Sequence, residues 1–282
     1  MSGYLIRHGS SALEVAITDV KELHPHEEVI PEEVNRLAQS IHQEGTLHHP
    51  IMVDKESLTV LDGMHRLAAV ESLGCKRMLV CLIDYANPAV VVNVWYRCFR
   101  DKRFCNLAET LATRLRLRQD ARDLEGIRRG LQARSIRLAL LADKYFTVDQ
   151  NKPIEEIFNM IKEIERESGM QVSYETEIEA IDKLCAGRVN GVVAFSPISK
   201  EEVVDSALKG YLFPCKTTRH FIPSRPLGVD VPLRTLLDEK TPLTEVNEDL
   251  AADLTRRKHR ILHPGSVIDG RRYQEELVIF NP

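Results

Sequence analysis

The sequence predicts an α/β (α+β) protein built from two lobes. Strand-like and helix-like segments alternate over the first hundred residues, and a second alternation of the same kind begins near residue 146. A strongly basic stretch at 97–137 lies between them. Alternating strands and helices favour sheets covered by helices. A length of 282 residues suits one large domain or two smaller ones with a sizeable core.

The first lobe is predicted to contain two helices and three strands. Apolar residues recur at intervals of three and four after Pro31, which predicts an amphipathic helix that stops at Gly45. A second apolar-periodic stretch predicts a helix over 64–73, before Gly74. Short apolar runs bounded by polar residues predict the strands. These runs are 51–53, 58–61 and 78–83, of which the last is continuous enough to be fully buried.

The second lobe is predicted from the same two kinds of pattern. Three short apolar runs predict strands, at 146–148, 172–174 and 191–195. Three periodic stretches predict helices, one beginning at Pro153, one over 176–186 and one over 199–209. Ser199 and Glu202 have the spacing of a capping box at the start of the last helix.

The composition is that of an ordinary globular protein. The chain has 38 Lys and Arg against 42 Asp and Glu, a net charge of −4, with 43% hydrophobic residues. No apolar run approaches the roughly 20 residues of a membrane span, and the N-terminus has no signal-peptide layout. We therefore expect a cytoplasmic protein without a membrane partner. The six cysteines have no metal-binding spacing, and we expect them to be reduced and mostly buried.

The net charge is unevenly distributed. Residues 97–137 contain 12 Lys and Arg against 5 Asp and Glu, a local charge of +7, and the rest of the chain therefore sums to −11. Leucines at 107, 111, 115, 124, 131 and 138 predict helices here with a basic exposed face. Such a face is either solvated or docked on acidic residues, or else it binds a polyanion such as nucleic acid. The first interpretation is favoured.

The sharpest local motif is the sequence Asp-Gly-Met-His-Arg at 62–66, where a predicted strand runs directly into a predicted helix. A helix N-terminus presents unpaired N–H groups, and Gly63 allows the backbone to approach an anion closely. His65 and Arg66 add donors, although positive side chains in a first turn oppose the helix dipole. The motif indicates a phosphate site. The alternative is that Asp62 is only an N-cap and Arg66 a surface residue.

Two further polar segments could carry chemistry. Cys-Lys-Thr-Thr-Arg-His at 215–220 places two cations, two hydroxyls and an imidazole between turn-forming residues, which suits an oxyanion clamp. His-Pro-His-Glu-Glu at 24–28 precedes the first helix, so Glu27 could be a general base or simply a charge that favours the helix dipole. The usual nucleotide-binding glycine motifs, kinase signatures and esterase elbow are absent from the sequence.

Taken in order, these motifs resemble the ParB/sulfiredoxin-like fold and, within it, the ADP- or ATP-dependent free L-serine kinases. The resemblance spans most of residues 15–237. Its matching stretches are His24–Glu27, Asp62–Arg66, Val94–Tyr96, Lys216–His220 and Pro223. The turn of sulfiredoxins carries a reactive cysteine where this chain has Met64, which argues against sulfinic-acid repair. The ParB proteins that bind DNA have helix-turn-helix readers, and the later half of this chain alternates strands and helices instead.

The resemblance implies a role for each matching residue. Glu27 would be the catalytic base that takes the proton from the serine hydroxyl. The nucleotide phosphates would be held, with Mg²⁺ assisting, by the segment Asp62, Gly63, Met64, His65 and Arg66, in which Met64 departs from a family histidine. Phosphate or the serine carboxylate would be contacted by Lys216, Thr217 and Arg219. The serine pocket would be shaped by Trp95, Thr218 and His220. Protein ligands for the metal are not identifiable from the sequence.

The sequence thus predicts a catalytic ParB/sulfiredoxin-like domain at 1–105, a second α/β domain at 106–237 and an extension at 238–282, with the active site in a cleft between the two domains. The reaction would transfer a phosphoryl group from ATP or ADP to free L-serine, giving O-phospho-L-serine.

Two alternatives to this function stay open. One is a kinase for another small hydroxylated metabolite, and the other is a nucleotide-dependent DNA-binding or regulatory protein, although a nucleic-acid partner is disfavoured. The extension, with a predicted hairpin at 267–273, is expected to serve packing, oligomerisation or regulation, and the oligomeric state is left open.

Overall fold

The computed structural model describes residues 3–8, 11–268 and 270–280. Internal contacts divide the chain into two compact units, and both are discontinuous in sequence. Unit 1 consists of residues 1–91, 200–212 and 220–282, and unit 2 consists of residues 92–199 and 213–219. Both units combine strands and helices, so the predicted α/β class is confirmed.

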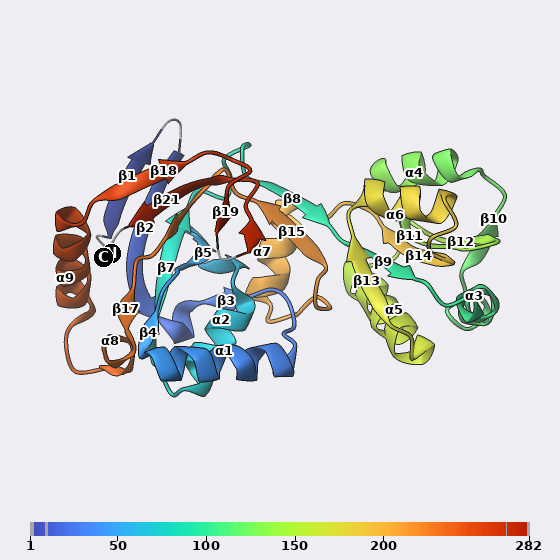
Figure 1. Cartoon of the computed structure of the whole chain (residues 1–282). Coiled ribbons are helices and arrows are strands. Elements are labelled where there is room, and N and C mark those ends of the chain that lie inside the picture. Colours follow the sequence, from blue (N-terminus) through green and yellow to red (C-terminus); the bar gives the residue numbers. More distant parts are fainter. Residues whose placement is uncertain (1–2, 9–10, 269, 281–282) are drawn as a thin grey trace. The chain divides into compact units, whose positions relative to one another are not determined.

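The main sheet of unit 1 has six strands in the order β1-β2-β7-β5-β6-β3 (Figure 1). The strands are β1 (Tyr4–His8), β2 (Ser11–Asp19), β3 (His24–Pro25), β5 (Ile51–Asp54), β6 (Thr59–Asp62) and β7 (Arg77–Ile83). All residues of β7 are buried, which confirms the prediction from its continuous apolar run. β7 pairs antiparallel with β2 and parallel with β5, so it occupies the middle of the sheet.

Two helices of unit 1 match the sequence prediction closely. α1 (Pro31–Glu44) begins at Pro31 and ends where Gly45 adopts the left-handed conformation, with φ 64°. α2 (Met64–Ser72) follows β6 directly and packs against α1. A third helix, α7 (Lys200–Leu208), contacts β3 and β6. A short 3₁₀ turn at Val20–Glu22 connects β2 to β3.

Residues after 220 complete unit 1 rather than forming a separate extension. The strands here are β16 (Ser224–Leu227), β17 (Val231–Pro232), β18 (His259–Leu262), β19 (Val267–Ile268), β20 (Arg271–Arg272) and β21 (Glu276–Phe280). β21 pairs parallel with β16 and antiparallel with β18, while β17 pairs with β4 (Thr46–Leu47). The predicted hairpin is confirmed by the pairing of β19 with β20. The helices are α8 (Leu233–Leu237) and α9 (Leu243–Arg256).

The two units differ from the predicted linear division into 1–105, 106–237 and 238–282. Residues 238–268 and 270–280 pack into unit 1, because β21 pairs with β16 and α9 lies against β1 and β2 (Figure 1). The segment 106–237 contributes to both units. The chain passes from one unit to the other within β8 (Val91–Val94) and again within β15 (Thr218–Phe221). These two strands pair with each other. Sequence-local patterns carry no signal for such long-range pairing.

Asn247 of α9 fastens the C-terminal region to the main sheet. Its side-chain oxygen accepts from the Ile17 N–H at 2.7 Å, and its amide donates to the Ile17 carbonyl at 2.9 Å. Ile17 lies beyond Val15, the last β2 residue that pairs with β1. Asn247, which is 2% exposed, therefore replaces a missing strand partner.

We expect Asn247→Ala to destabilise the protein by about 2–4 kcal/mol, because it leaves a buried donor and a buried acceptor of Ile17 unsatisfied. The free energy of unfolding from urea titration measures this loss. Glu248→Gln, an exposed substitution on the next residue of α9, is the control and should change the stability by less than about 0.5 kcal/mol. Equal stabilities of the two variants would contradict the expectation.

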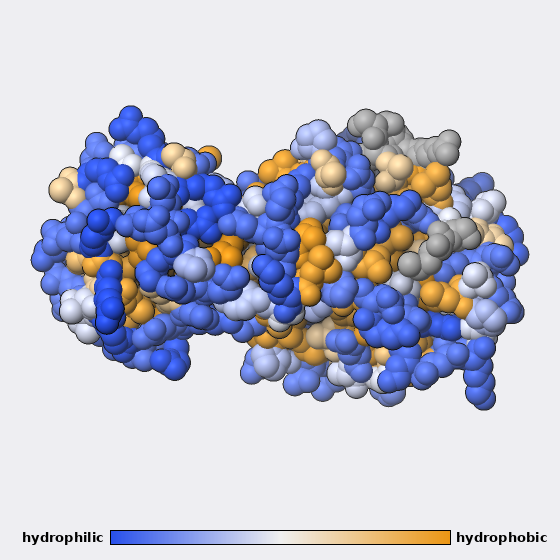
Figure 2. All heavy atoms as spheres, turned by 180° about the vertical axis from the view of Figure 1, so that it is seen from behind, coloured by the Kyte–Doolittle hydropathy of each residue, from blue (hydrophilic) through white to orange (hydrophobic). Residues whose placement is uncertain are grey.

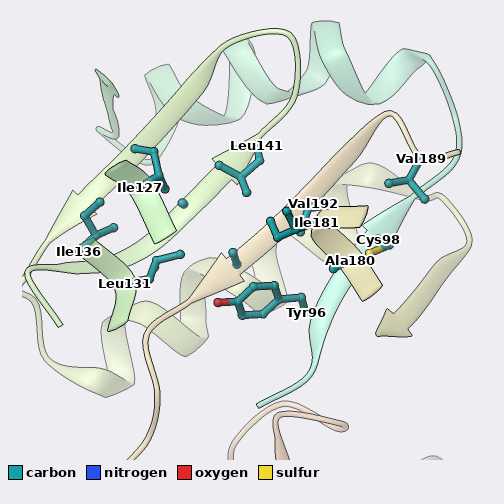
Figure 3. Packing of buried hydrophobic residues seen from close by; sticks show 12 residues of the cluster. Tyr96, Cys98, Ile127, Leu131, Ile136, Leu141, Ala180, Ile181, Val189 and Val192 are labelled. Atoms are coloured by element: carbon teal, nitrogen blue, oxygen red, sulfur yellow. The ribbon is translucent and has the colours of Figure 1, made fainter. Parts of the chain in front are cut away.

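Unit 2 contains a second six-stranded sheet, in the order β10-β12-β11-β14-β9-β13. The strands are β9 (Tyr96–Phe99), β10 (Arg118–Asp120), β11 (Ile136–Leu141), β12 (Tyr145–Asp149), β13 (Val172–Glu175) and β14 (Gly191–Phe195). The helices are α3 (Arg103–Arg114), α4 (Leu124–Gln132), α5 (Ile154–Ser168) and α6 (Glu177–Cys185). Figure 3 shows apolar side chains of α4 and α6 packed with those of β9, β11 and β14 in one core.

The basic stretch at 97–137 is docked largely on carboxylates. Arg114 pairs with Glu163 and Glu167 of α5, and Arg118 pairs with Asp149. Further ion pairs join Arg103 to Asp101, Arg122 to Asp120, and Arg128 to Glu125 and Glu177. This arrangement supports the structural interpretation of the basic stretch. Helices are present here as expected, except that Leu138 belongs to strand β11, where it faces a sheet core.

The helices, the surface and the cysteines can be compared with the expectations from the composition. Within the described ranges, no helix combines the length and the apolarity that a membrane crossing requires. On the face shown in Figure 2, hydrophilic residues surround separate apolar groups. All six cysteines are free thiols, of which Cys75, Cys81 and Cys98 are buried and Cys185 is exposed.

Candidate active site

The turn between β6 and α2 leads from a strand through Gly63 directly into a helix, as the sequence predicted. Gly63 has φ +103°, and a Cβ added there would lie 2.5 Å from Cγ2 of Ile51. Only glycine fits this position. The first intrahelical hydrogen bond runs from the Leu67 N–H to the Gly63 carbonyl at 3.0 Å. The N–H groups of residues 64–66 therefore precede the hydrogen-bonded part of α2, where an anion is favoured by the helix dipole.

The side chain of Arg66 connects this turn to the segment before β5 by hydrogen bonds. Its Nη1 donates to the backbone carbonyls of His49 (3.1 Å) and Pro50 (2.7 Å), and its Nη2 lies 3.5 Å from Oδ2 of Asp62. The guanidinium thus links α2 to the segment that enters β5. Met64 begins α2, and both Met64 and Arg66 are partly exposed.

Glu27, the predicted catalytic base, lies beside the end of β6. β3 pairs parallel with β6, matching Pro25 with Val60, and this pairing brings residues 26–27 next to the turn. Glu27 is 8% exposed, and its Oε1 is 3.8 Å from Nε2 of the fully buried His26. Further along, the Ile30 N–H donates to Nε2 of His65 at 3.0 Å. The first turn of α2 therefore fixes the segment that follows Glu27.

His26 is held in one tautomer by its partners. Its Nδ1 lies 2.7 Å from the Val60 carbonyl, which can only accept, so Nδ1 carries the proton and Nε2 of neutral His26 is unprotonated. Burial lowers the pKa of His26, although Glu27 and Asp62 oppose this shift. A neutral imidazole beside Glu27 adds no positive charge that would oppose protonation of that carboxylate.

His220 joins the same cluster from the 216–220 motif. Its ring centroid is 5.4 Å from that of His26, and its Nε2 forms a hydrogen bond with the Tyr85 hydroxyl at 2.8 Å. Burial, followed by the nearby His26, lowers the pKa of His220 to about 3, against the opposing pull of Asp62. Lys200 of α7 donates to the carbonyls of Tyr85 (2.6 Å) and Asn87 (2.8 Å) and so fixes the segment that carries the hydroxyl.

In unit 2, the structure brings Trp95 together with the 216–219 motif. The Trp95 N–H donates to the Thr217 carbonyl at 3.1 Å, and the Arg219 guanidinium stacks on the indole at 5.1 Å from its centroid. Thr217 is fully buried, and its hydroxyl donates to the Pro214 carbonyl at 2.7 Å. Thr218 is 8% exposed, whereas Lys216 is exposed with φ +59°.

Arg97 organises this second cluster, and sequence reasoning missed it. The side chain is 0% exposed and forms an ion pair with Glu165 at 2.8 Å. It also donates to the carbonyls of Trp95 (3.0 Å) and Cys215 (3.1 Å) and to the Thr217 hydroxyl (3.3 Å). Arg97 therefore ties two stretches that are far apart in sequence. The available signal was an arginine between Tyr96 and Cys98 in a strand whose residues are all buried.

Burial of neutral His26 has a consequence for stability against pH. A histidine whose pKa is lowered in the folded protein stabilises the fold above its unfolded value of about 6.5, and this stability is lost as the pH falls below that value. We expect the His26→Gln variant to lose stability less steeply than the parent between pH 7.5 and 5, with a slope smaller by up to about 1.4 kcal/mol per pH unit. Urea unfolding at several pH values measures the slopes. His42→Gln, on the exposed side of α1, should keep the parent's slope, and a parental slope in His26→Gln would refute the expectation.

Comparison with known proteins finds relatives that are similar over most of the chain. Residues 6–95 match the family model of the ParB N-terminal domain. An ATP-dependent L-serine kinase of Staphylothermus marinus is 26% identical over 234 residues, which cover 79% of this chain and 92% of that protein. An ADP-dependent L-serine kinase of Thermococcus kodakarensis is 25% identical over 227 residues, which cover 77% of this chain and 91% of that protein.

A solved structure of a free serine kinase in complex with AMP superimposes with a TM-score of 0.66 at 25% identity, covering 79% of this chain and 93% of that chain. The resemblance to the free serine kinases that the ordered motifs predicted is therefore confirmed. The fold is that of a ParB-like domain joined to a second α/β part, as expected.

Proposed function

We propose that this protein is a free L-serine kinase, a phosphotransferase that moves the terminal phosphoryl group of ATP or ADP to the hydroxyl of L-serine. The observation that carries the proposal is the buried carboxylate of Glu27 beside a strand-to-helix turn in which Gly63 has a φ of +103°. The serine-kinase names of the relatives, which are similar over most of this chain, support the same activity. ATP and ADP are cytoplasmic metabolites, so we place the reaction in the cytoplasm.

Phosphoryl transfer needs aligned oxygens and neutralised charge more than covalent help from the protein. In our proposal, the serine hydroxyl oxygen attacks the terminal phosphorus, Glu27 takes the hydroxyl proton, and the nucleotide leaves one phosphate shorter. Neutral His26, whose Nε2 is 3.8 Å from Oε1 of Glu27, adds no positive charge that would oppose protonation of that carboxylate.

The remaining residues are assigned to binding. The nucleotide phosphates would contact the turn formed by Asp62, Gly63, Met64, His65 and Arg66. The serine would be bound by Trp95, Thr218 and His220, and phosphate or the serine carboxylate by Lys216, Thr217 and Arg219. Because Arg66 already braces the turn with Nη1, its contribution to phosphate binding would come from the Nη2 side.

Magnesium is expected to enter with the nucleotide. Among residues 3–8, 11–268 and 270–280, no group of three or more His, Cys, Asp or Glu side chains is placed to hold a metal. Mg²⁺ usually keeps several waters and binds through substrate phosphates and one or two carboxylates. When bound, the ion would supply charge neutralisation on the phosphates.

The deciding experiment incubates the purified protein with Mg²⁺ and either ATP or ADP, together with L-serine, L-threonine or L-homoserine. Mass spectrometry and ³¹P NMR should detect O-phospho-L-serine, and the two nucleotides identify the donor. Phosphorylation of another acceptor in place of serine would assign a different metabolite kinase. No product with any acceptor, together with salt-sensitive DNA binding, would overturn the proposal in favour of a nucleotide-dependent DNA-binding protein.

A further inference from the structure

The C-terminal region reaches the proposed phosphate site through one buried arginine. Nη1 of Arg225 lies 2.5 Å from Oδ2 of Asp62, and its Nε lies 2.6 Å from Oε1 of Glu275. The arginine therefore stands between the last residue of β6 and the residue that immediately precedes β21. Arg225 and Glu275 are 6% and 8% exposed, whereas Asp62 is partly exposed.

Backbone pairing determines where Glu275 lies. Ser224 of β16 pairs with Glu276 of β21, and the Glu276 N–H donates to the Pro223 carbonyl at 3.0 Å. A small apolar cluster of Leu227, Tyr273 and Leu277 packs around this pairing. The pairing of β21 with β16 and the apolar cluster around it therefore place Glu275 beside Arg225.

Charge explains why the three side chains act together. Burial alone would disfavour a charged guanidinium, but Asp62 and Glu275 together raise the pKa of Arg225. Nε of Arg225 and Oε1 of Glu275 form an ion pair, but Nε has no hydrogen-bond partner in the part of the chain that the structure describes. Removing one member of such a buried set leaves an uncompensated charge, and the remaining groups rearrange or lose stability. Asp62 is the member at the turn, so a shift of Arg225 is transmitted to the phosphate site.

We propose that Arg225 and Glu275 are positioning residues that hold the Asp62 carboxylate in place beside the phosphate-binding turn, so that residues after 238 form part of the functional site. This inference rests on the proposed role of residues 62–66 in binding nucleotide. It assigns to the C-terminal region a function in nucleotide binding that packing alone would not require. Neither residue belongs to a motif that the sequence singled out.

The test is a double-mutant cycle between Glu275→Gln and Asp62→Asn, in which both substitutions keep the side-chain size. The dissociation constants for ATP and ADP, measured by calorimetric titration, are compared with the steady-state constants for serine phosphorylation. We expect Glu275→Gln to weaken nucleotide binding by about tenfold in the parent and by less than about twofold in the Asp62→Asn background. Glu248→Gln, an exposed substitution in the same region, is the matched control and should bind like the parent.

Each outcome bears on the proposal. Parental binding by Glu275→Gln would overturn it, and so would a tenfold loss that persists undiminished without Asp62, because independent effects multiply. A thermal melt shows whether any loss comes from unfolding, and Arg225→Lys, which keeps the charge, should restore part of the affinity that Arg225→Ala loses. If the parent binds nucleotide but phosphorylates no serine, the proposed function fails while the cycle still decides this inference. A parent that binds neither nucleotide overturns both.

Discussion

The Glu27→Gln variant is expected to lose serine phosphorylation by about 10²–10⁴-fold in kcat while its affinity for nucleotide stays near that of the parent. Glutamine keeps the size of the side chain and cannot take a proton from the serine hydroxyl. Glu27 lies next to His26 and not within the turn at 62–66, so nucleotide contacts should survive. Initial-rate kinetics and calorimetric titration of ATP and ADP measure the two quantities.

A matched control separates loss of the base from loss of negative charge near α1. Glu32 is exposed in the first turn of that helix, and Glu32→Gln should keep the parental kcat. Near-normal turnover by Glu27→Gln would exclude it as the general base.

Substituting Gly63 by alanine is expected to abolish most nucleotide binding. The new Cβ would lie 2.5 Å from Cγ2 of Ile51 and 3.0 Å from Nη2 of Arg66, at a φ of +103°. The turn must therefore shift, and with it the N–H groups at the start of α2. We expect the dissociation constants for ATP and ADP to rise more than about tenfold, with a loss of about 1–3 kcal/mol in the free energy of unfolding.

Gly74→Ala is the control, because it carries the backbone cost alone. Gly74 also has a positive φ, of 80°, but a Cβ there would meet no heavy atom within 4 Å. This variant should lose stability by about 1 kcal/mol and bind nucleotide normally. If both variants bind equally well, close approach at Gly63 has no role in recognising phosphate.

Local patterns were sufficient for the elements that form the proposed phosphate site. Apolar spacing and the stop at Gly45 predicted α1, and the short apolar runs predicted β5, β6 and the buried β7. The turn at 62–66 could be identified because strand, glycine and helix follow one another directly. These features depend on neighbours within a few residues, and a single sequence contains that information.

The features that the sequence did not predict depend on contacts between residues that are far apart in the chain. Nothing near Arg225 shows that it will lie between Asp62 and Glu275, because that arrangement requires β16 to pair with β21. Arg97 is similar, since its partners Glu165 and Cys215 come from other elements. The boundaries of the two units were missed for the same reason. For Arg97, the available signal was a single charged residue in an apolar strand. This pattern indicates that the residue is buried, but it does not show which residue pairs with it.

The order in which the ribosome delivers the chain has a consequence for the discontinuous unit 1. Its first 91 residues emerge early, but β21 begins only at Glu276. At roughly 5–20 residues per second, the early segment waits roughly 10–40 seconds for α9 and β21. Unit 2 is almost complete by residue 199 and can fold during that interval. Meanwhile the edge of β2 that Asn247 later covers is open to other chains, so rapid overproduction should favour aggregation through that edge and coexpressed chaperones should relieve it.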